Sequence, residues 1–253
     1  ASEDAPAEGK GGAAAAPAAT SKRSMLKFAL PTLGIYLADP LMSNIDNGFV
    51  GRLGGTQALA ALGPGATLSN SVLFLFGNIL NSATTGLVSR AWATDGGENK
   101  EAAKAELART LSFGLLVGGL LTAGYVFLTP WALGRIGTPL DILPQAASYV
   151  QIRGLVAWAV LSQGCCLSAI LATREAMTPL YVIALAAVLN FAGDWLFCYW
   201  PFQWSVAGAA AATALSQLAS FGLMLRALGR KGIAPTPRLP RLEDVKPLME
   251  YAG

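Results

Sequence analysis

The sequence contains no histidine and few charged residues, since Asp, Glu, Lys and Arg together make up 13% of its 253 residues. The absence of histidine removes the commonest metal ligand and the usual general base. The shortage of charge leaves too few polar side chains to cover the surface of a soluble protein of this length. The composition therefore argues against a soluble globular protein.

Cysteine is also scarce. Cys165, Cys166 and Cys198 all lie in apolar segments, and the adjacent pair has the spacing of neither a zinc site nor a redox motif, so we interpret all three as packing residues. The sequence shows no nucleophile–base pair and no phosphate-binding loop, so we expect neither an enzyme nor a bound cofactor. The net charge of +3 forms no basic stripe, which argues against nucleic acid as a partner.

Apolar residues, by contrast, make up 53% of the chain. They fall into blocks long enough to cross a bilayer core of about 30 Å, which takes about 20 helical residues. The sequence therefore predicts an all-α membrane protein whose partner is the lipid bilayer. The six expected spans are residues 25–50, 58–92, 107–133, 146–172, 180–200 and 206–228.

Composition divides the chain into three parts. Residues 1–24 are rich in Ala, Gly and Pro and begin without Met, so we expect a disordered segment of a kind found near plastid transit-peptide junctions. Residues 25–231 form the expected six-helix lobe, in which the small residues of the sixth span predict a central helix. Residues 232–253 stop where another span could begin, and we expect a linker to a missing second lobe.

Lysine and arginine predict the orientation. With six spans, both ends of the lobe lie on one side of the membrane. Only Arg52 and Arg135 fall on the other side, and only Arg153 falls within a span away from its ends. The basic residues expected on the first side are Lys10, Lys22, Arg23, Lys27, Arg90, Lys100, Lys104, Arg109, Arg174, Arg226, Arg230, Lys231, Arg238, Arg241 and Lys246.

Three carboxylates, Asp39, Asp46 and Asp194, lie inside expected spans. Each costs about 2.5–3.5 kcal/mol at a helix centre, and Arg153 neutralises at most one of them. The others must then take up a proton or hold a cation. Asn190 and Asp194 are four residues apart and share a helix face. If this face meets Asp46 at one cavity, the oxygens suit Na⁺ or proton exchange.

Each of these residues also has a structural interpretation. Asp39 precedes Pro40, whose missing N–H breaks the ladder of helical hydrogen bonds. Asp39 is therefore either a functional carboxylate or a residue that caps a helix kink. Asp46 and Asp194 could instead reach the headgroups from a span edge. Arg153 either pairs inside the membrane or extends to the interface. Gly114 and Gly118 form a GxxxG pattern, which we attribute to helix packing.

The sequence resembles a known transporter family along residues 27–228. The run LPTLGIYLADPLMSNIDNGFVGRLGGTQALAALGPG is similar to the first helix and loop of the multidrug and toxic compound extrusion (MATE) family, and VLNFAGDWLF and VAGAAAATALSQ are similar to its fifth and sixth helices. The resemblance implies a lobe of a two-lobed antiporter that exports small organic compounds in exchange for H⁺ or Na⁺. It places the coupling site on Asp46, Asn190, Asp194 and Thr213, and a bend of the first helix at Pro31.

The chain departs from the family because only one lobe is present. Relatives with similar ADPL and GTQALAALGPG segments include plastid proteins, so we expect a chloroplast envelope or thylakoid membrane. Asp39 and Arg153 remain possible secondary polar residues. The missing lobe leaves an alternative, in which a half-length chain is a structural or assembly subunit of a larger membrane complex.

Overall fold

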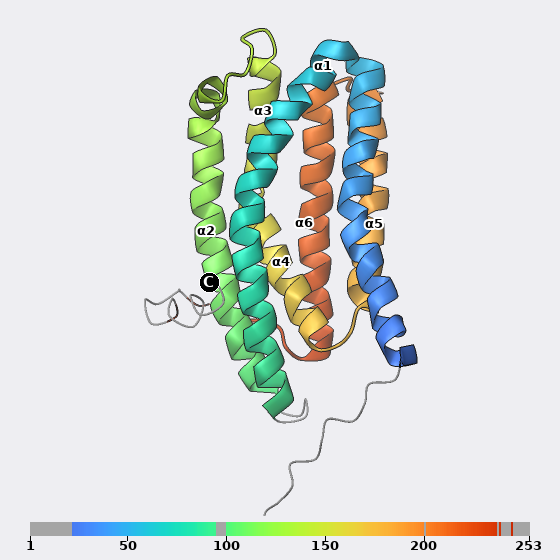
Figure 1. The fold of residues 1–253 in the computed structure, drawn as a ribbon, viewed down its shortest axis with the longest axis vertical. Helices are drawn as coiled ribbons and strands as arrows, with labels where there is room; N and C mark the ends of the chain where they lie inside the picture. The colour runs from blue at the N-terminus through green and yellow to red at the C-terminus, as the bar shows by residue number, and fades with distance from the viewer. Residues whose placement is uncertain (1–21, 95–99, 200, 237, 239–243, 245–253) are drawn as a thin grey trace, which may run out of the picture.

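The structure is a computed structural model that describes residues 22–94, 100–199, 201–236, 238 and 244. All regular elements in these ranges are helices, which lie alongside one another as a bundle (Figure 1). Residues 1–21 of the predicted disordered segment and most of the predicted linker lie outside the described residues, whereas residues 22–24 are helical and begin α1. The elements are α1 (Lys22–Thr94), α2 (Lys100–Arg135), α3 (Leu143–Gly154), α4 (Ala157–Ala172), α5 (Met177–Asp194), the π-helical turn η1 (Trp195–Tyr199) and α6 (Ser205–Lys231).

Helix α1 contains the first two predicted spans. Gly55 has non-helical backbone angles, φ 74° and ψ −173°, which glycine adopts without a steric penalty. In Figure 1 the chain runs along the bundle, turns at one end and returns, so α1 consists of two antiparallel limbs, residues 22–54 and 56–94. The two limbs of α1 correspond to the first two spans. The remaining spans are α2, the bent α3–α4 pair, α5 and α6. The prediction of an all-α, multi-pass membrane protein is confirmed.

The fourth span, predicted over residues 146–172, is divided into two helices with a bend between them. The axes of α3 and α4 differ by 49°. Gly154 ends α3 where the Tyr125 side chain of α2 packs so closely that a Cβ on residue 154 would overlap it. The Tyr125 hydroxyl donates a hydrogen bond to the Ser69 carbonyl oxygen at 2.8 Å, which fixes the ring. The bend therefore follows from a tertiary contact that helical periodicity does not reveal.

Helix α6 is the central helix, as its small residues predict. Half of its most apolar 18-residue stretch is buried, against 22–28% for the corresponding stretches of α1, α2 and α5 with η1. Gly208 lies against the backbone of Phe197, and Gly193 of α5 lies against Ala212. These close approaches need residues without bulky side chains, because each extra methylene would separate the helices.

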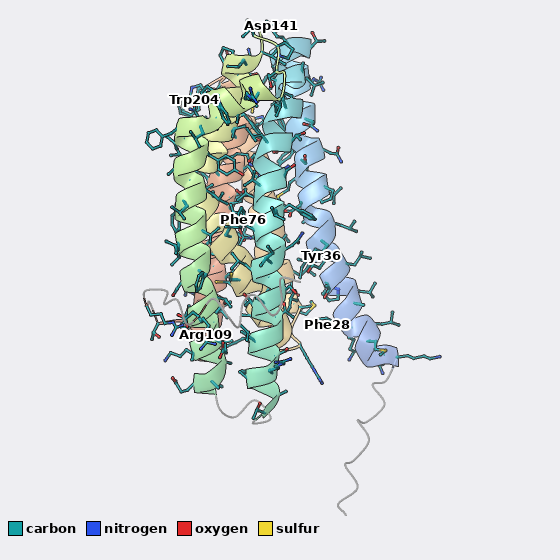
Figure 2. All side chains as sticks on the ribbon, turned by 60° about the vertical axis from the view of Figure 1, so that its left-hand side comes forward. Phe28, Tyr36, Phe76, Arg109, Asp141 and Trp204 are labelled. Carbon is teal, nitrogen blue, oxygen red and sulfur yellow. The ribbon has the colours of Figure 1, made fainter. Side chains whose placement is uncertain are left out.

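One end of the bundle, which we call the basic end, carries most of the described lysines and arginines. It holds the starts of α1, α2 and α5 and the ends of α4 and α6 (Figure 1). Figure 2 shows Arg109 near this end, and Asp141 and Trp204 near the other. The basic residues at this end include Lys22, Arg23, Lys27, Arg90, Lys100, Lys104, Arg109, Arg174, Arg226, Arg230 and Lys231.

Neighbouring glycines of α2 provide a test of this packing. Gly118 is buried against the backbone of Trp158, and an added Cβ would overlap it, whereas an added Cβ on exposed Gly119 meets nothing within 4 Å. Gly118→Ala should lower the free energy of unfolding by about 1–3 kcal/mol through overpacking. Gly119→Ala should be neutral or slightly stabilising. Thermal unfolding of the two variants in detergent makes the comparison, and equal melting temperatures would contradict the packing of α2 on α4.

Candidate functional site

The candidate site joins residues from three helices inside the bundle. Asp46 lies on the first limb of α1, Asn190 and Asp194 lie on α5, and Thr213 lies on α6. All four are buried, with Asn190 1% and Asp194 0% exposed. The sequence placed these residues together only conditionally, and the structure brings them into one cluster.

The Asn190 amide links the two carboxylates. Its Nδ2 donates hydrogen bonds to Asp46 Oδ1 at 2.7 Å and to Asp194 Oδ2 at 3.1 Å. The second bond follows from local structure, because residues four apart lie one above the other on a helix. The first joins α5 to α1 across 144 residues of sequence. One side chain therefore holds two carboxylates from different helices in a single network.

Helix α6 completes the cluster with two hydroxyl groups. Thr213 Oγ1 donates to Asp46 Oδ2 at 3.0 Å and also lies 3.0 Å from the Ala209 carbonyl oxygen. Ser216 Oγ donates to Asn190 Oδ1 at 3.3 Å, which orients the amide so that its N–H groups face the carboxylates. Ser216 was not among the predicted site residues. Its spacing of three from Thr213 in ATALSQ is the signal that could have identified it.

No basic side chain of the described residues neutralises the two carboxylates. In the described part of the chain, neither Asp46 nor Asp194 has a lysine or arginine nitrogen within 4.0 Å. Asp194 Oδ1 is buried and has no hydrogen-bond partner among the described residues. Two carboxylates in a low-dielectric site repel each other unless a positive charge lies between them or one is neutralised. The site is therefore chemically suited to bind a proton or a monovalent cation.

Arg153, the single basic residue predicted within a span away from its ends, has other partners than this pair. Its Nη1 donates to Asn70 Oδ1 and to the Tyr149 hydroxyl, both at 3.1 Å. Its guanidinium carbon also lies 5.6 Å from the centre of the Tyr149 ring, within cation–π range. Arg153 is thus fixed inside the lobe by neutral partners.

A cavity of about 420 Å³ lies beside the cluster, and both Asp46 and Thr213 line it. Arg153 and Asp39 line the same cavity, although Asp39 lies outside the hydrogen-bonded cluster. The wall contains apolar side chains and neutral polar groups that can donate and accept hydrogen bonds. The neutral polar residues of the wall include Ser43, Asn70, Asn78, Asn81, Gln163, Gln217 and Ser220.

Pro31, the predicted bend, is buried on the same limb of α1 as Asp46. The limb remains helical through Pro31 and Pro40. Proline has no N–H to bond the carbonyl one turn earlier, so the ladder is weakened at these two points. The limb that carries Asp46 therefore has built-in points of low bending stiffness.

Comparisons with known proteins agree with this architecture. The MatE family model matches residues 31–196. Protein DETOXIFICATION 47, chloroplastic, of Arabidopsis thaliana is 34% identical over 213 residues, which cover 83% of this chain and 38% of that protein. DNA damage-inducible protein F of Escherichia coli is 29% identical over 81% of this chain and 44% of its own length. The chain spans about half the length of the curated relatives it matches.

Solved structures share the fold. The bent form of the Vibrio cholerae MATE transporter VcmN has a TM-score of 0.79 at 22% identity, over 91% of this chain and 52% of that one. A crystal structure of MATE in the bent conformation has a TM-score of 0.80 at 19% identity, over 91% and 51% of the two chains. The family model covers more than half of the sequence, and the shared fold covers 91% of the chain. The chain therefore belongs to the MatE family, the multidrug and toxic compound extrusion transporters.

Proposed function

We propose that residues 25–231 form the N-terminal lobe of a cation-coupled antiporter that exports small organic compounds across a membrane. The observation that carries the proposal is the pair of buried carboxylates, Asp46 and Asp194, bridged by Asn190 beside a cavity and without a basic partner in the described residues. Such a pair exchanges a proton or Na⁺ at low cost, because either ion relieves the same repulsion. Nothing in the described residues favours the alternative of an assembly subunit.

The coupling step follows from the hydrogen bonds of Asp46. Its two oxygens accept bonds from Asn190 of α5 and Thr213 of α6, and these bonds hold the first limb of α1 against both helices. A proton or Na⁺ that binds Asp46 competes with the Asn190 and Thr213 donors and weakens their hydrogen bonds to the carboxylate. The limb then bends at Pro31, the cavity changes shape, and the substrate is displaced.

Asp39 and Arg153 supply charged contacts of opposite sign on the cavity wall. In this proposal they orient polar groups of the substrate, while the apolar wall holds its hydrocarbon part. Because the wall is mostly neutral, it places few geometric demands on the substrate. This is the property expected of an exporter with broad specificity.

The proposed partners are the lipid bilayer and a second six-helix lobe, to which residues 232–253 lead. Matched relatives are about twice as long as this chain, which supports a second lobe. Several are named chloroplastic, including DETOXIFICATION 47 and DETOXIFICATION 44 of Arabidopsis thaliana. These names support our proposal that the protein lies in a plastid membrane.

The first prediction concerns ion-driven flux. In proteoliposomes that contain the full-length protein, an imposed proton or Na⁺ gradient should accelerate export of a fluorescent organic cation or anion, rhodamine 6G or fluorescein. Asp46→Asn should reduce this acceleration by about tenfold or more, because the amide removes a charge-assisted interaction worth roughly 1.5–3 kcal/mol. Asp141→Asn is the matched control, since Asp141 is an exposed carboxylate far from the cavity.

Imposing the two gradients in separate experiments identifies the coupling ion. Flux driven by a proton gradient alone indicates H⁺, and flux driven by a Na⁺ gradient alone indicates Na⁺. Equal, gradient-independent flux by the wild type and Asp46→Asn would contradict the coupling role. A loss of flux in Asp141→Asn equal to that in Asp46→Asn would show that the effect is not specific to the buried site.

A second prediction concerns ion binding without transport. A ligand present at one hundred times its dissociation constant stabilises the folded state by about 2.7 kcal/mol. The melting temperature of the full-length protein in detergent should therefore rise when Na⁺ replaces choline, or should change between pH 5 and 8 if the ion is a proton. Asp194→Asn should remove that dependence and Asp141→Asn should keep it. A wild-type melting temperature that responds to neither ion would contradict an exchangeable site.

A further inference from the structure

A second cavity lies at the basic end, between the start of α5 and the end of α6. Its volume is about 560 Å³. The two helices pack antiparallel, so the residues near Thr178 of α5 face those near Arg230 of α6. This cavity is separate from the one beside Asp46, and the two share no lining residue.

Two of the three basic residues in this cavity have no counter-ion in the part of the chain that the structure describes. Lys231 Nζ forms an ion pair with Glu175, which also accepts a hydrogen bond from the Thr178 hydroxyl. Partial burial acts to raise the pKa of Glu175, but the hydrogen bonds from Lys231 and Thr178 and the charge of Lys231 together lower it. Glu175 is therefore ionised at neutral pH and neutralises Lys231. Arg226 and Arg230 have no ion pair within the described residues, so the cavity keeps a net positive charge.

Basic and apolar side chains line this cavity at different depths. Arg226 and Arg230 are four residues apart, so both point from the same face of α6. Leu223 lies on that face about 10 Å further into the bundle than Arg230, at 1.5 Å per residue. Val182 of α5 lines the cavity opposite the α6 face, and Tyr181 beside it is 66% exposed. The cavity is thus cationic at its mouth and apolar toward the membrane interior.

A cavity that is cationic at its mouth and apolar further in suits an amphiphile better than a free anion. A lipid phosphate at the mouth can accept bidentate hydrogen bonds from guanidinium groups. Its acyl chain can follow Val182 and Leu223 into the hydrocarbon region, where a free phosphate gains nothing. The basic end is also where anionic headgroups are attracted in a membrane protein with this distribution of charge.

We propose that the groove between α5 and α6 at the basic end is a binding site for an anionic phospholipid, whose headgroup phosphate contacts Arg226 and Arg230. The site does not depend on the proposed transport cycle. It uses residues outside the Asp46 cluster, and its occupancy is measurable without a substrate or an ion gradient.

Native mass spectrometry of the full-length protein tests the proposal. The delipidated protein is titrated with phosphatidylglycerol or phosphatidylcholine at fixed ionic strength. The wild type should bind phosphatidylglycerol about tenfold more tightly than phosphatidylcholine, and the double variant Arg226→Gln/Arg230→Gln should lose most of that preference. Lys22→Gln/Arg23→Gln is the control, because it removes two exposed charges at the same end without touching the groove.

Three results would overturn the assignment. Equal wild-type affinity for the two lipids would exclude a headgroup site. Equal losses in the groove and control variants would show only a general attraction to the basic end. Displacement of bound phosphatidylglycerol by millimolar inorganic phosphate would identify a free-anion site instead. The wild-type comparison and the phosphate competition stand even if the double variant fails to fold.

Discussion

The arrangement of α1, α5 and α6 in the lobe depends on the hydrogen bonds of the Asn190 amide to Asp46 and Asp194. They bring carboxylates from α1 and α5 together in an apolar bundle and supply N–H donors but no positive charge. Thr213 and Ser216 of α6 fix the remaining polar atoms of the cluster except one Asp194 oxygen. In the proposed function a proton or a cation balances the charge of this network, and we expect the position of α1 to depend on that ion.

The packing of the lobe makes this network possible. Small residues let α6 lie at the centre, so that its hydroxyl groups reach α1 and α5 together. Gly55 reverses α1, which places Asp46 on one limb and the cavity residue Asn70 on the other. Asn70 and Tyr149 then hold Arg153 at the cavity wall, where it does not cancel the charge of the pair. Close packing of the helices thus brings the two carboxylates together, and it keeps Arg153 bound to other partners.

Local rules predicted the spans and identified Asp46, Asn190 and Asp194 individually, whereas Thr213 was predicted only from the family resemblance. Apolar runs of bilayer length predict helices, and carboxylates in such runs are rare enough to stand out individually. The four-residue spacing of Asn190 and Asp194 placed them on one face. The bend after Gly154, the Asn70–Arg153 bond and the groove at Arg226 depend on contacts between distant segments, which spacing does not reveal. Ser216 was missed because a serine in a helix of small residues is ordinarily a packing residue.

The central claim is that Asp46 and Asp194 lie in an apolar site and hold an exchangeable positive charge. Labelling with an apolar carbodiimide, followed by peptide mass spectrometry, tests it most directly, since this reagent modifies protonated carboxyl groups in apolar surroundings. An exchangeable site predicts modification of Asp46 or Asp194 at low pH and protection as the pH rises or Na⁺ is added. Modification of both residues by a water-soluble carbodiimide to the same extent as Asp141, unaffected by Na⁺, would contradict it.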